Sequence, residues 1–174
     1  MAIRNILLDG DRSLRKKSRA VTDFNKRLHI LLDDMRETLA EANGLGLAAP
    51  QVGVLRRAVL VIDTEAEGGE QIIELVNPEI LEMHGEQCGQ EGCLSVPGVY
   101  GLVTRPLELK VRAQDRHGKF FEKQCAGTTA RAVCHEIDHL EGRLFTEIAE
   151  RILSPEELEQ LNQAEDGETA EEEE

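Results

Sequence analysis

The sequence is poor in aromatic residues and has no long apolar run. Trp is absent, and the 174 residues include one Tyr and four Phe. This scarcity argues against a large platform for stacking bases, and we expect no direct nucleic-acid binding. The apolar stretches are too short to span a bilayer, and the first residues lack the apolar core of a signal peptide. We therefore expect no membrane association and a cytoplasmic location.

Cysteine is also scarce, with four residues in the chain. Without a sign of export, so few cysteines favour free thiols or metal ligands over a disulfide framework. A chain of this length is one ordinary domain, long enough to bury a hydrophobic core without stabilisation by disulfide bonds or structural metal ions. We expect this domain to be a monomer.

Basic residues are missing from the C-terminal end. The net charge is −14, and residues 161–174 hold seven acidic side chains and no basic one. Such a composition is typical of a solvated, disordered segment, and it would repel the phosphates of a nucleic acid. We therefore expect a single domain over residues 1–163 and a disordered acidic tail over residues 164–174.

Hydrophobic periodicity predicts most elements of the chain. Apolar residues at helical spacing predict a helix that begins near Phe24, is capped by Thr22 or Asp23 and ends at residues 43–44. Residues 9–20 are polar and irregular, which predicts a surface loop. Apolar or alternating runs bounded by turn residues predict strands over residues 56–64, 71–76, 79–84, 107–113 and 120–125.

Two further helices are predicted after the strands. The first spans about residues 129–141 and is capped by Thr128 or Thr129. The second begins at a capping box over residues 154–157, with Pro at its first helical position, and ends near Gln163. Together these elements predict an α+β fold. We expect antiparallel β-sheets packed around a buried helix, with one helix near the N-terminus and a short one near the C-terminus.

The predicted helix over residues 129–141 carries the motif His-Glu-x-x-His. His135 and His139 lie one turn apart on one helix face, so both imidazoles can reach one metal ion. Glu136 lies beside them, where it can move a proton on water at such an ion. Apolar positions bury this helix, and buried His and Glu side chains need partners or a metal. The alternative is a solvated helix face whose histidines have no function.

A metal site of this kind needs a third ligand. The candidates are the cysteines at positions 88, 93, 125 and 134. Cys134 adjoins His135, but a helix turns its side chain about 100° away from the ligand face. Cys93 follows a glycine, which allows a close approach to a metal, and the backbone N–H of Leu94 could point toward the same site. One Cys and two His leave a fourth position open for water, as in catalytic sites.

Residues 44–51 form a stretch rich in Gly and Ala. Its Gly-x-Gly pattern is weak support for a dinucleotide site, because no third glycine follows and the stretch ends a helix instead of opening one. The glycines are better explained by backbone that lies close to something, such as a ligand. The amide of Gln51 could donate to a developing oxyanion, or it could bond to local backbone.

Three stretches together resemble the motifs of the bacterial peptide deformylases, in the same order. They are GLGLAAPQ at residues 44–51, EGCLS at residues 91–95 and HEIDHL at residues 135–140. Three matches in one chain are far more specific than any one of them, and the resemblance covers roughly residues 1–150. It implies that Cys93, His135 and His139 bind one metal ion.

The resemblance also implies an activity and the residues that carry it out. It implies a hydrolase that removes the formyl group from N-formylmethionyl nascent peptides and releases formate. Glu136 would be the general base and acid, while Gln51 and the backbone N–H of Leu94 would stabilise the oxyanion. Leu45 and Gly46 would pair with the substrate backbone like an added strand.

Other parts of the resemblance concern the pocket, the metal and the C-terminus. Ala132, one turn before His135, could form a wall of the pocket for the methionine side chain. The family's usual metal is Fe(2+), and the ligands also suit Zn(2+), Ni(2+) or Co(2+). Cys134 stands where many members have Gln, which predicts changed packing. The acidic C-terminal end differs from the basic helix with which some relatives dock on the ribosome, so ribosome association is left open.

Two rival hypotheses use the same histidines. A zincin-type protease would take its third ligand from a His or Glu further along the chain, but no His follows His139. A closed structural zinc site would consist of Cys88, Cys93, His135 and His139 and would have no catalytic role. The spacing of the two cysteines permits this site, although a gap of about 40 residues to the histidines is long for a zinc finger.

Overall fold

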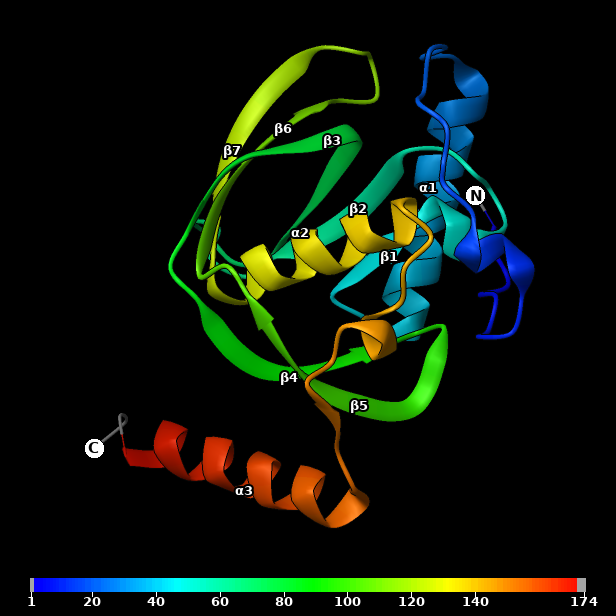
Figure 1. The fold of residues 1–174 in the computed structure, drawn as a ribbon. Helices are drawn as coiled ribbons and strands as arrows, with labels where there is room; N and C mark the ends of the chain where they lie inside the picture. The colour runs from blue at the N-terminus through cyan, green and yellow to red at the C-terminus, as the bar shows by residue number, and fades with distance from the viewer. Residues whose placement is uncertain (1, 172–174) are drawn as a thin grey trace.

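The computed structural model describes residues 2–171, and it describes residues 164–171 by their backbone alone. In this part of the chain, a five-stranded sheet and a three-stranded sheet surround the helix α2 (Gly127–Leu140) (Figure 1). All strand pairs within the two sheets are antiparallel. The predicted α+β class, with antiparallel sheets around the helix that carries the two histidines, is confirmed.

The five-stranded sheet contains the strands that the sequence predicts. Its order is β1 (Gly46–Ala48), β2 (Ala58–Asp63), β3 (Gln71–His84), β6 (Glu108–Gln114) and β7 (Phe120–Ala126). The separate strands predicted over residues 71–76 and 79–84 are one strand, β3. Asn77 has a left-handed backbone with φ 51°, and the register shifts between Val76 and Glu79. The Asn-Pro pair therefore makes a bulge inside β3 and does not end the strand.

The three-stranded sheet was not predicted. It consists of β4 (Gln87–Cys93), β5 (Val96–Arg105) and the short β8 (Arg151–Ile152). The sequence of β4, QCGQEGC, has two glycines and no β-branched or aromatic residue. Its strand geometry comes from pairing with β5, which runs from Gln87 opposite Arg105 to Cys93 opposite Val96. Pairing between strands has overridden local propensity here.

Helix α1 (Lys26–Ala42) begins two residues later than predicted, at Lys26 instead of Phe24. The side chain of Asn25 accepts hydrogen bonds from the backbone N–H groups of Arg27 and Leu28, so Asn25 is the cap in place of Thr22 or Asp23. The helix ends as predicted, at Asn43 with a left-handed φ of 53°. In the segment predicted as a loop over residues 9–20, a 3-10 helix η1 (Arg12–Arg15) buries Leu14.

Helix α2 begins earlier than predicted and without a side-chain cap. Its N-cap residue is Ala126, which forms no capping hydrogen bond, so the predicted caps at Thr128 and Thr129 are wrong. The hydroxyl of Thr129 instead lies 3.3 Å from Oδ1 of Asp63 on β2. This contact ties the start of α2 to the five-stranded sheet.

Strand β2 is buried on both faces, which places α2 and α1 on opposite sides of the sheet. Side chains of a strand alternate between its faces. Val59 packs in a cluster with Val133 of α2, whereas Leu60 packs with Met35 of α1. The two clusters hold α2 against the sheet, and one face of α2 is left for the polar groups described below.

The C-terminal segment leads away from this core. The 3-10 helix η3 (Phe145–Glu147) follows α2, and the last helix is α3 (Pro155–Glu171), which extends beyond β5 in Figure 1. Another 3-10 helix, η2 (Ala49–Val52), follows β1 much earlier in the chain. The predicted capping box is present: Ser154 N donates to Glu157 Oε2 at 2.9 Å, and Glu157 N donates to Ser154 Oγ at 3.2 Å. The helix continues past Gln163, where its end was predicted. Residues 172–174 of the predicted disordered tail lie outside the described residues, and the division of the chain at residue 163 stays a prediction.

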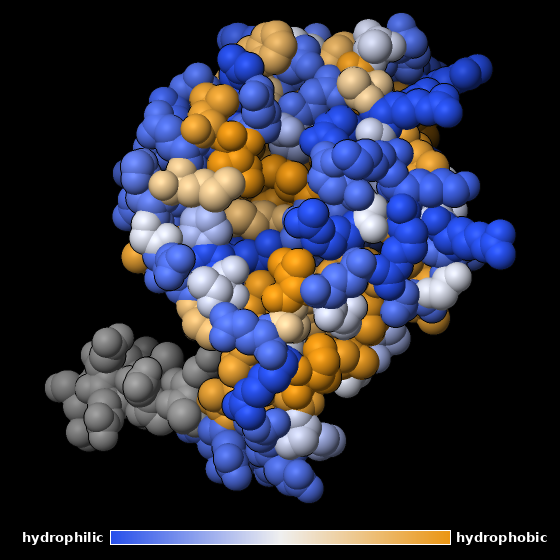
Figure 2. Space-filling view, viewed as in Figure 1, coloured by the Kyte–Doolittle hydropathy of each residue, from blue (hydrophilic) through white to orange (hydrophobic). Residues whose placement is uncertain are grey.

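Hydrophilic side chains cover most of the face in Figure 2, with apolar side chains gathered in its middle and beside α3. Among the helices of residues 2–171, none combines the length and apolarity that a transmembrane helix requires.

Candidate active site

Three potential metal ligands meet where β4 ends against α2. His135 and His139 lie on the same face of α2, with ring centroids 5.0 Å apart, and both are buried. Cys93 is the last residue of β4, and its Sγ lies 3.3 Å from Nε2 of His139. The ligand atoms of the three residues lie within 4.8 Å of one another. The fold thus brings together the three residues that the sequence analysis selected.

These donors fit a divalent ion with one open coordination position. One thiol and two imidazoles suit zinc, iron, nickel or cobalt, and three protein ligands are typical of catalytic sites. Cys88 is exposed and does not belong to the group of ligand atoms found among the described residues. Cys134 is buried in the apolar cluster around α2, as its position on the helix predicts. Burial raises the pKa of the Cys134 thiol to about 11, which opposes thiolate formation.

Glu91 orients the first histidine, and sequence reasoning missed this role. Its Oε2 lies 2.9 Å from Nδ1 of His135, so Nε2 of that ring is left for a metal. Arg105 holds the same carboxylate with Nε at 2.8 Å from Oε1 and Nη2 at 3.1 Å from Oε2. Burial by itself would raise the pKa of Glu91, but the hydrogen bonds with His135 and Arg105 lower it to about 2. Glu91 is therefore a buried carboxylate that stays ionised.

The signal for Glu91 was present in the sequence. Glu91 precedes Cys93 by two residues in the recognised stretch EGCLS. A histidine that ligates a metal usually donates its second ring N–H to an acceptor such as a carboxylate. Applying this rule to the segment around Cys93 would have selected Glu91.

Glu136 is the buried carboxylate that faces the backbone of β1. A Cβ atom added to Gly46 would lie 2.4 Å from Oε1 of Glu136, so this position requires glycine. The close neighbour that the sequence analysis expected for this glycine includes the Glu136 side chain. Oε2 of Glu136 has no hydrogen-bond partner among the described residues. Burial raises the pKa of Glu136 to about 7, which suits proton transfer near neutral pH.

Gln51 bonds to local backbone, which is one of the two alternatives that the sequence analysis left open. Its Oε1 accepts a hydrogen bond from the backbone N–H of Ala48 at 2.8 Å. Its Nε2 lies 3.1 Å from Oγ of Ser95 and 3.6 Å from Sγ of Cys93. The bond to Ala48 fixes the orientation of the amide, and the N–H groups therefore face the ligand cluster.

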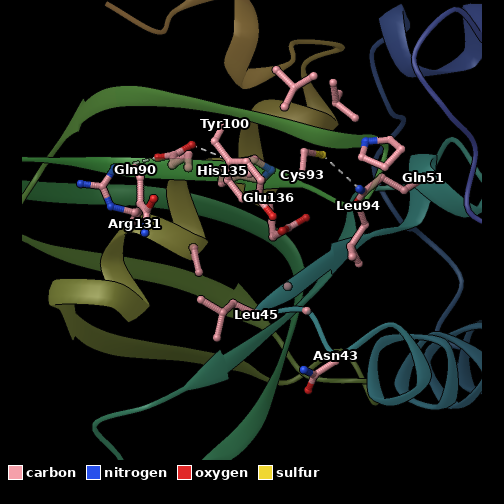
Figure 3. A pocket seen from close by; sticks show the side chains of 18 of the residues that line it. Asn43, Leu45, Gln51, Gln90, Cys93, Leu94, Tyr100, Arg131, His135 and Glu136 are labelled. Atoms are coloured by element: carbon pink, nitrogen blue, oxygen red, sulfur yellow. Dashed lines mark hydrogen bonds and ion pairs between the residues drawn. The ribbon is translucent and has the colours of Figure 1, made fainter. Parts of the chain in front are cut away.

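A cavity of about 460 Å³ adjoins these groups (Figure 3). Its walls include eight of the nine predicted site residues, namely Leu45, Gly46, Gln51, Cys93, Leu94, Ala132, His135 and Glu136. The ninth, His139, lies deeper and is 1 % exposed. β1 is the last strand of its sheet, and its residue Gly46 is in the cavity wall, so this strand can offer its free edge to an extended ligand.

Comparisons with known proteins find the same family along most of the chain. The family model described as polypeptide deformylase matches residues 3–153. A peptide deformylase of Caldicellulosiruptor bescii is 57% identical over 160 residues, which cover 92% of this chain and 93% of the relative. One of Alkaliphilus metalliredigens is 57% identical over 147 residues, which cover 84% of this chain and 97% of the relative.

Solved structures resemble the chain over a similar extent. The peptide deformylase from Thermotoga maritima matches with a TM-score of 0.81 at 34% identity, covering 87% of this chain and 100% of that one. The one from Legionella pneumophila matches with a TM-score of 0.80 at 40% identity, covering 94% of this chain and 98% of that one. With its fold, the order of its motifs and its sequence in agreement, the chain belongs to the peptide deformylase family.

Proposed function

We propose that Cys93, His135 and His139 bind the metal ion with which this chain, as a peptide deformylase, removes the formyl group from the N-terminal methionine of newly made polypeptides. The observation that carries the proposal is the approach of these three ligand atoms to within 4.8 Å of one another beside a cavity. When bound, a divalent ion supplies Lewis-acid catalysis and lowers the pKa of water. The remaining steps depend on the chain's own residues.

Glu136 transfers the proton in this proposal. As the general base it accepts a proton from the attacking water, and as the general acid it returns the proton to the leaving amine, so that formate and a free methionyl N-terminus are released. Its burial and its pKa of about 7 support this role, because the carboxyl group can exchange protons near neutral pH. Its unpartnered Oε2 is free to bond to the water.

The oxyanion is stabilised by the amide of Gln51 and the backbone N–H of Leu94. The hydrogen bond from Ala48 to Oε1 of Gln51 supports this assignment, because it orients the N–H groups before the reaction begins. Leu94 lies in the turn that follows Cys93 and lines the same cavity. One preorganised donor of this kind typically contributes about 3–4 kcal/mol to transition-state stabilisation.

The substrate is an N-formylmethionyl nascent peptide that lies along the free edge of β1. Leu45 and Gly46 pair with its backbone, and Ala132 forms part of the wall for the methionine side chain. Leu45 is 48% exposed, which suits a residue at the mouth of the cavity. The peptide then continues outward from the site.

The metal in the cell is Fe(2+) in this proposal, with Zn(2+), Ni(2+) and Co(2+) as substitutes. We expect the protein to act as a monomer in the cytoplasm. The first turn of α3 holds Glu156 and Glu157, so its charge offers no support for docking on ribosomal RNA.

The proposal is tested by purifying the protein without oxygen, measuring its metal content and assaying formate release from a formylmethionyl peptide. We expect one metal ion per chain, with iron predominant, and activity that is lost in air through oxidation of the metal or of Cys93. Equal activity after aerobic and anaerobic purification would contradict iron. Absence of formate release from the metal-loaded protein would contradict the function.

A further inference from the structure

Arg131 is a partly buried cation near the candidate metal site, and neither the motifs nor the proposed mechanism gives it a role. It lies on α2 one turn before His135, so the two side chains share a helix face. Its side chain is 13% exposed and lines the cavity, where Figure 3 shows it beside Gln90. A guanidinium in such a place needs several acceptors.

The guanidinium of Arg131 bonds to acceptors on two strands of the three-stranded sheet, β4 and β5. Nη1 donates to the carbonyl oxygen of Val103 on β5 at 2.9 Å, and it lies 3.5 Å from the carbonyl oxygen of Gly89 on β4. Nη2 donates to the carbonyl oxygen of Gln87 on β4 at 3.2 Å. These bonds fix the guanidinium relative to the strand backbone.

The same Nη1 also donates to Oε1 of Glu91 at 3.0 Å. Oε2 of that carboxylate lies 2.9 Å from Nδ1 of His135. Arg131 therefore reaches the metal ligand through a single intermediate, and the chain of contacts runs from the strand backbone through Arg131 and Glu91 to His135. Arg105 of β5 binds the carboxylate as well, and its remaining Nη1 contacts Asp138 of α2. Arg131 differs from it because its guanidinium bonds to the carboxylate and to carbonyl oxygens of the strands at once.

We propose that Arg131 is a positioning residue that fixes the carboxylate of Glu91 and thereby the ring of His135 for metal binding. This inference rests on the proposed function, because it needs His135 to be a ligand. Gly89 supports it independently: a Cβ atom there would lie 3.0 Å from Nη2 of Arg131. The strand thus leaves room for the guanidinium at the place where it is held.

The test uses Co(2+) as a spectroscopic probe in the full-length protein. Arg131→Met keeps an unbranched side chain but removes all hydrogen-bond donors, whereas Arg131→Lys keeps the positive charge but lacks the planar set of donors. The matched control is Arg112→Met, which removes an arginine that forms a surface ion pair with Glu79. The readouts are the visible absorption of the bound Co(2+), its dissociation constant and the melting temperature. We expect R131M to shift the absorption and to weaken Co(2+) binding about 10-fold, R131K to be intermediate and R112M to match the wild type.

An R131M protein with a lower melting temperature but the wild-type absorption and affinity would overturn the inference, since Arg131 would then only hold the strands to α2. Failure of the proposed function looks different, because the wild type and Cys93→Ser would then bind Co(2+) equally. If R131M does not fold, Gly89→Ala moves the guanidinium without removing it. We expect it to shift the absorption in the same direction by less, and an unchanged absorption in G89A would also overturn the inference.

Discussion

The two sheets contribute to the site in different ways. The five-stranded sheet packs apolar side chains such as Val59 and Leu75 against α2 and holds the helix in place. The three-stranded sheet faces the other side of α2 with ionised groups, among them Glu91 and Arg105. The first sheet therefore stabilises the helix that carries the histidines, and the second orients His135 and adds Cys93. Except for β1, whose residue Gly46 lies in the cavity wall, the five-stranded sheet supplies packing for α2, whereas the three-stranded sheet supplies polar contacts.

The largest expected effect is the loss of kcat on substitution of Glu136, the buried carboxylate of α2. Glu136→Gln should lower kcat for formate release by roughly 10²–10⁴-fold, because the amide cannot accept the proton. Metal content should stay at the wild-type level, since Glu136 is not one of the three ligands. Glu122→Gln, on the exposed side of β7, is the control and should keep full activity. Near-normal turnover by E136Q would remove Glu136 from the mechanism.

A paired substitution sharpens the division between the sheets. Glu91→Ala leaves Arg105 buried without its main partner, which should cost about 3–5 kcal/mol of unfolding free energy and weaken metal binding roughly 10–100-fold. Leu75→Ala should cost a similar 2–5 kcal/mol by opening a cavity, about the usual range for Leu to Ala in a core, with metal affinity unchanged. Denaturation curves and metal titrations measure both. If L75A weakened metal binding as much as E91A, the proposed division would be wrong.

An ionic cluster around Glu74, on the five-stranded sheet and away from the site, predicts a smaller effect of pH. Burial by itself would raise the pKa of Glu74, but hydrogen bonds from Arg116 and Arg36 hold it below its ordinary value of 4.5. Because the folded-state pKa is the lower one, this group's contribution is complete above pH 4.5 and is lost as the pH falls through the folded pKa. The melting temperatures of Glu74→Gln and the wild type should therefore converge once the pH is below the folded-state pKa of Glu74. A constant difference down to strong acid would contradict the assignment.

The smallest expected effect is that of Cys88→Ser. Cys88 lies exposed on β4, and a site built by Cys93 and the two histidines does not use it. Metal content and activity should both equal those of the wild type. Loss of the metal would revive the closed structural zinc site.

The sequence predicted the part of the fold whose cause is local. The apolar run over 58–62 and the helical spacing around α1 and α2 reflect burial of one segment at a time, so periodicity finds them. The motif on α2 gave His135 and His139 for the same reason. A one-turn spacing on a helix is a property of the segment alone.

What the sequence did not predict depends on partners far along the chain. β4 is a strand because β5 pairs with it, and its glycines hide it from propensity rules. Glu91 was within a recognised motif, but its partner His135 is on another element, and pairing the two requires the rule that a metal-ligating histidine bonds to a carboxylate through its second ring nitrogen. The cap of α1 was misplaced because Thr22, Asp23 and Asn25 all precede the helix and can cap it, and backbone geometry chooses among them. The cap of α2 was misplaced because this helix begins without a side-chain cap, at Ala126.

The central claim is that one sulfur from β4 and two nitrogens from α2 bind a single ion and leave a position open. X-ray absorption spectroscopy on the metal-loaded protein tests it directly, because sulfur and nitrogen ligands lie at different distances, about 2.3 Å and 2.0–2.1 Å for zinc. We expect one sulfur, two imidazole nitrogens and one light atom from solvent, with the sulfur signal lost in Cys93→Ser. A spectrum with two sulfurs, or with none, would contradict the account.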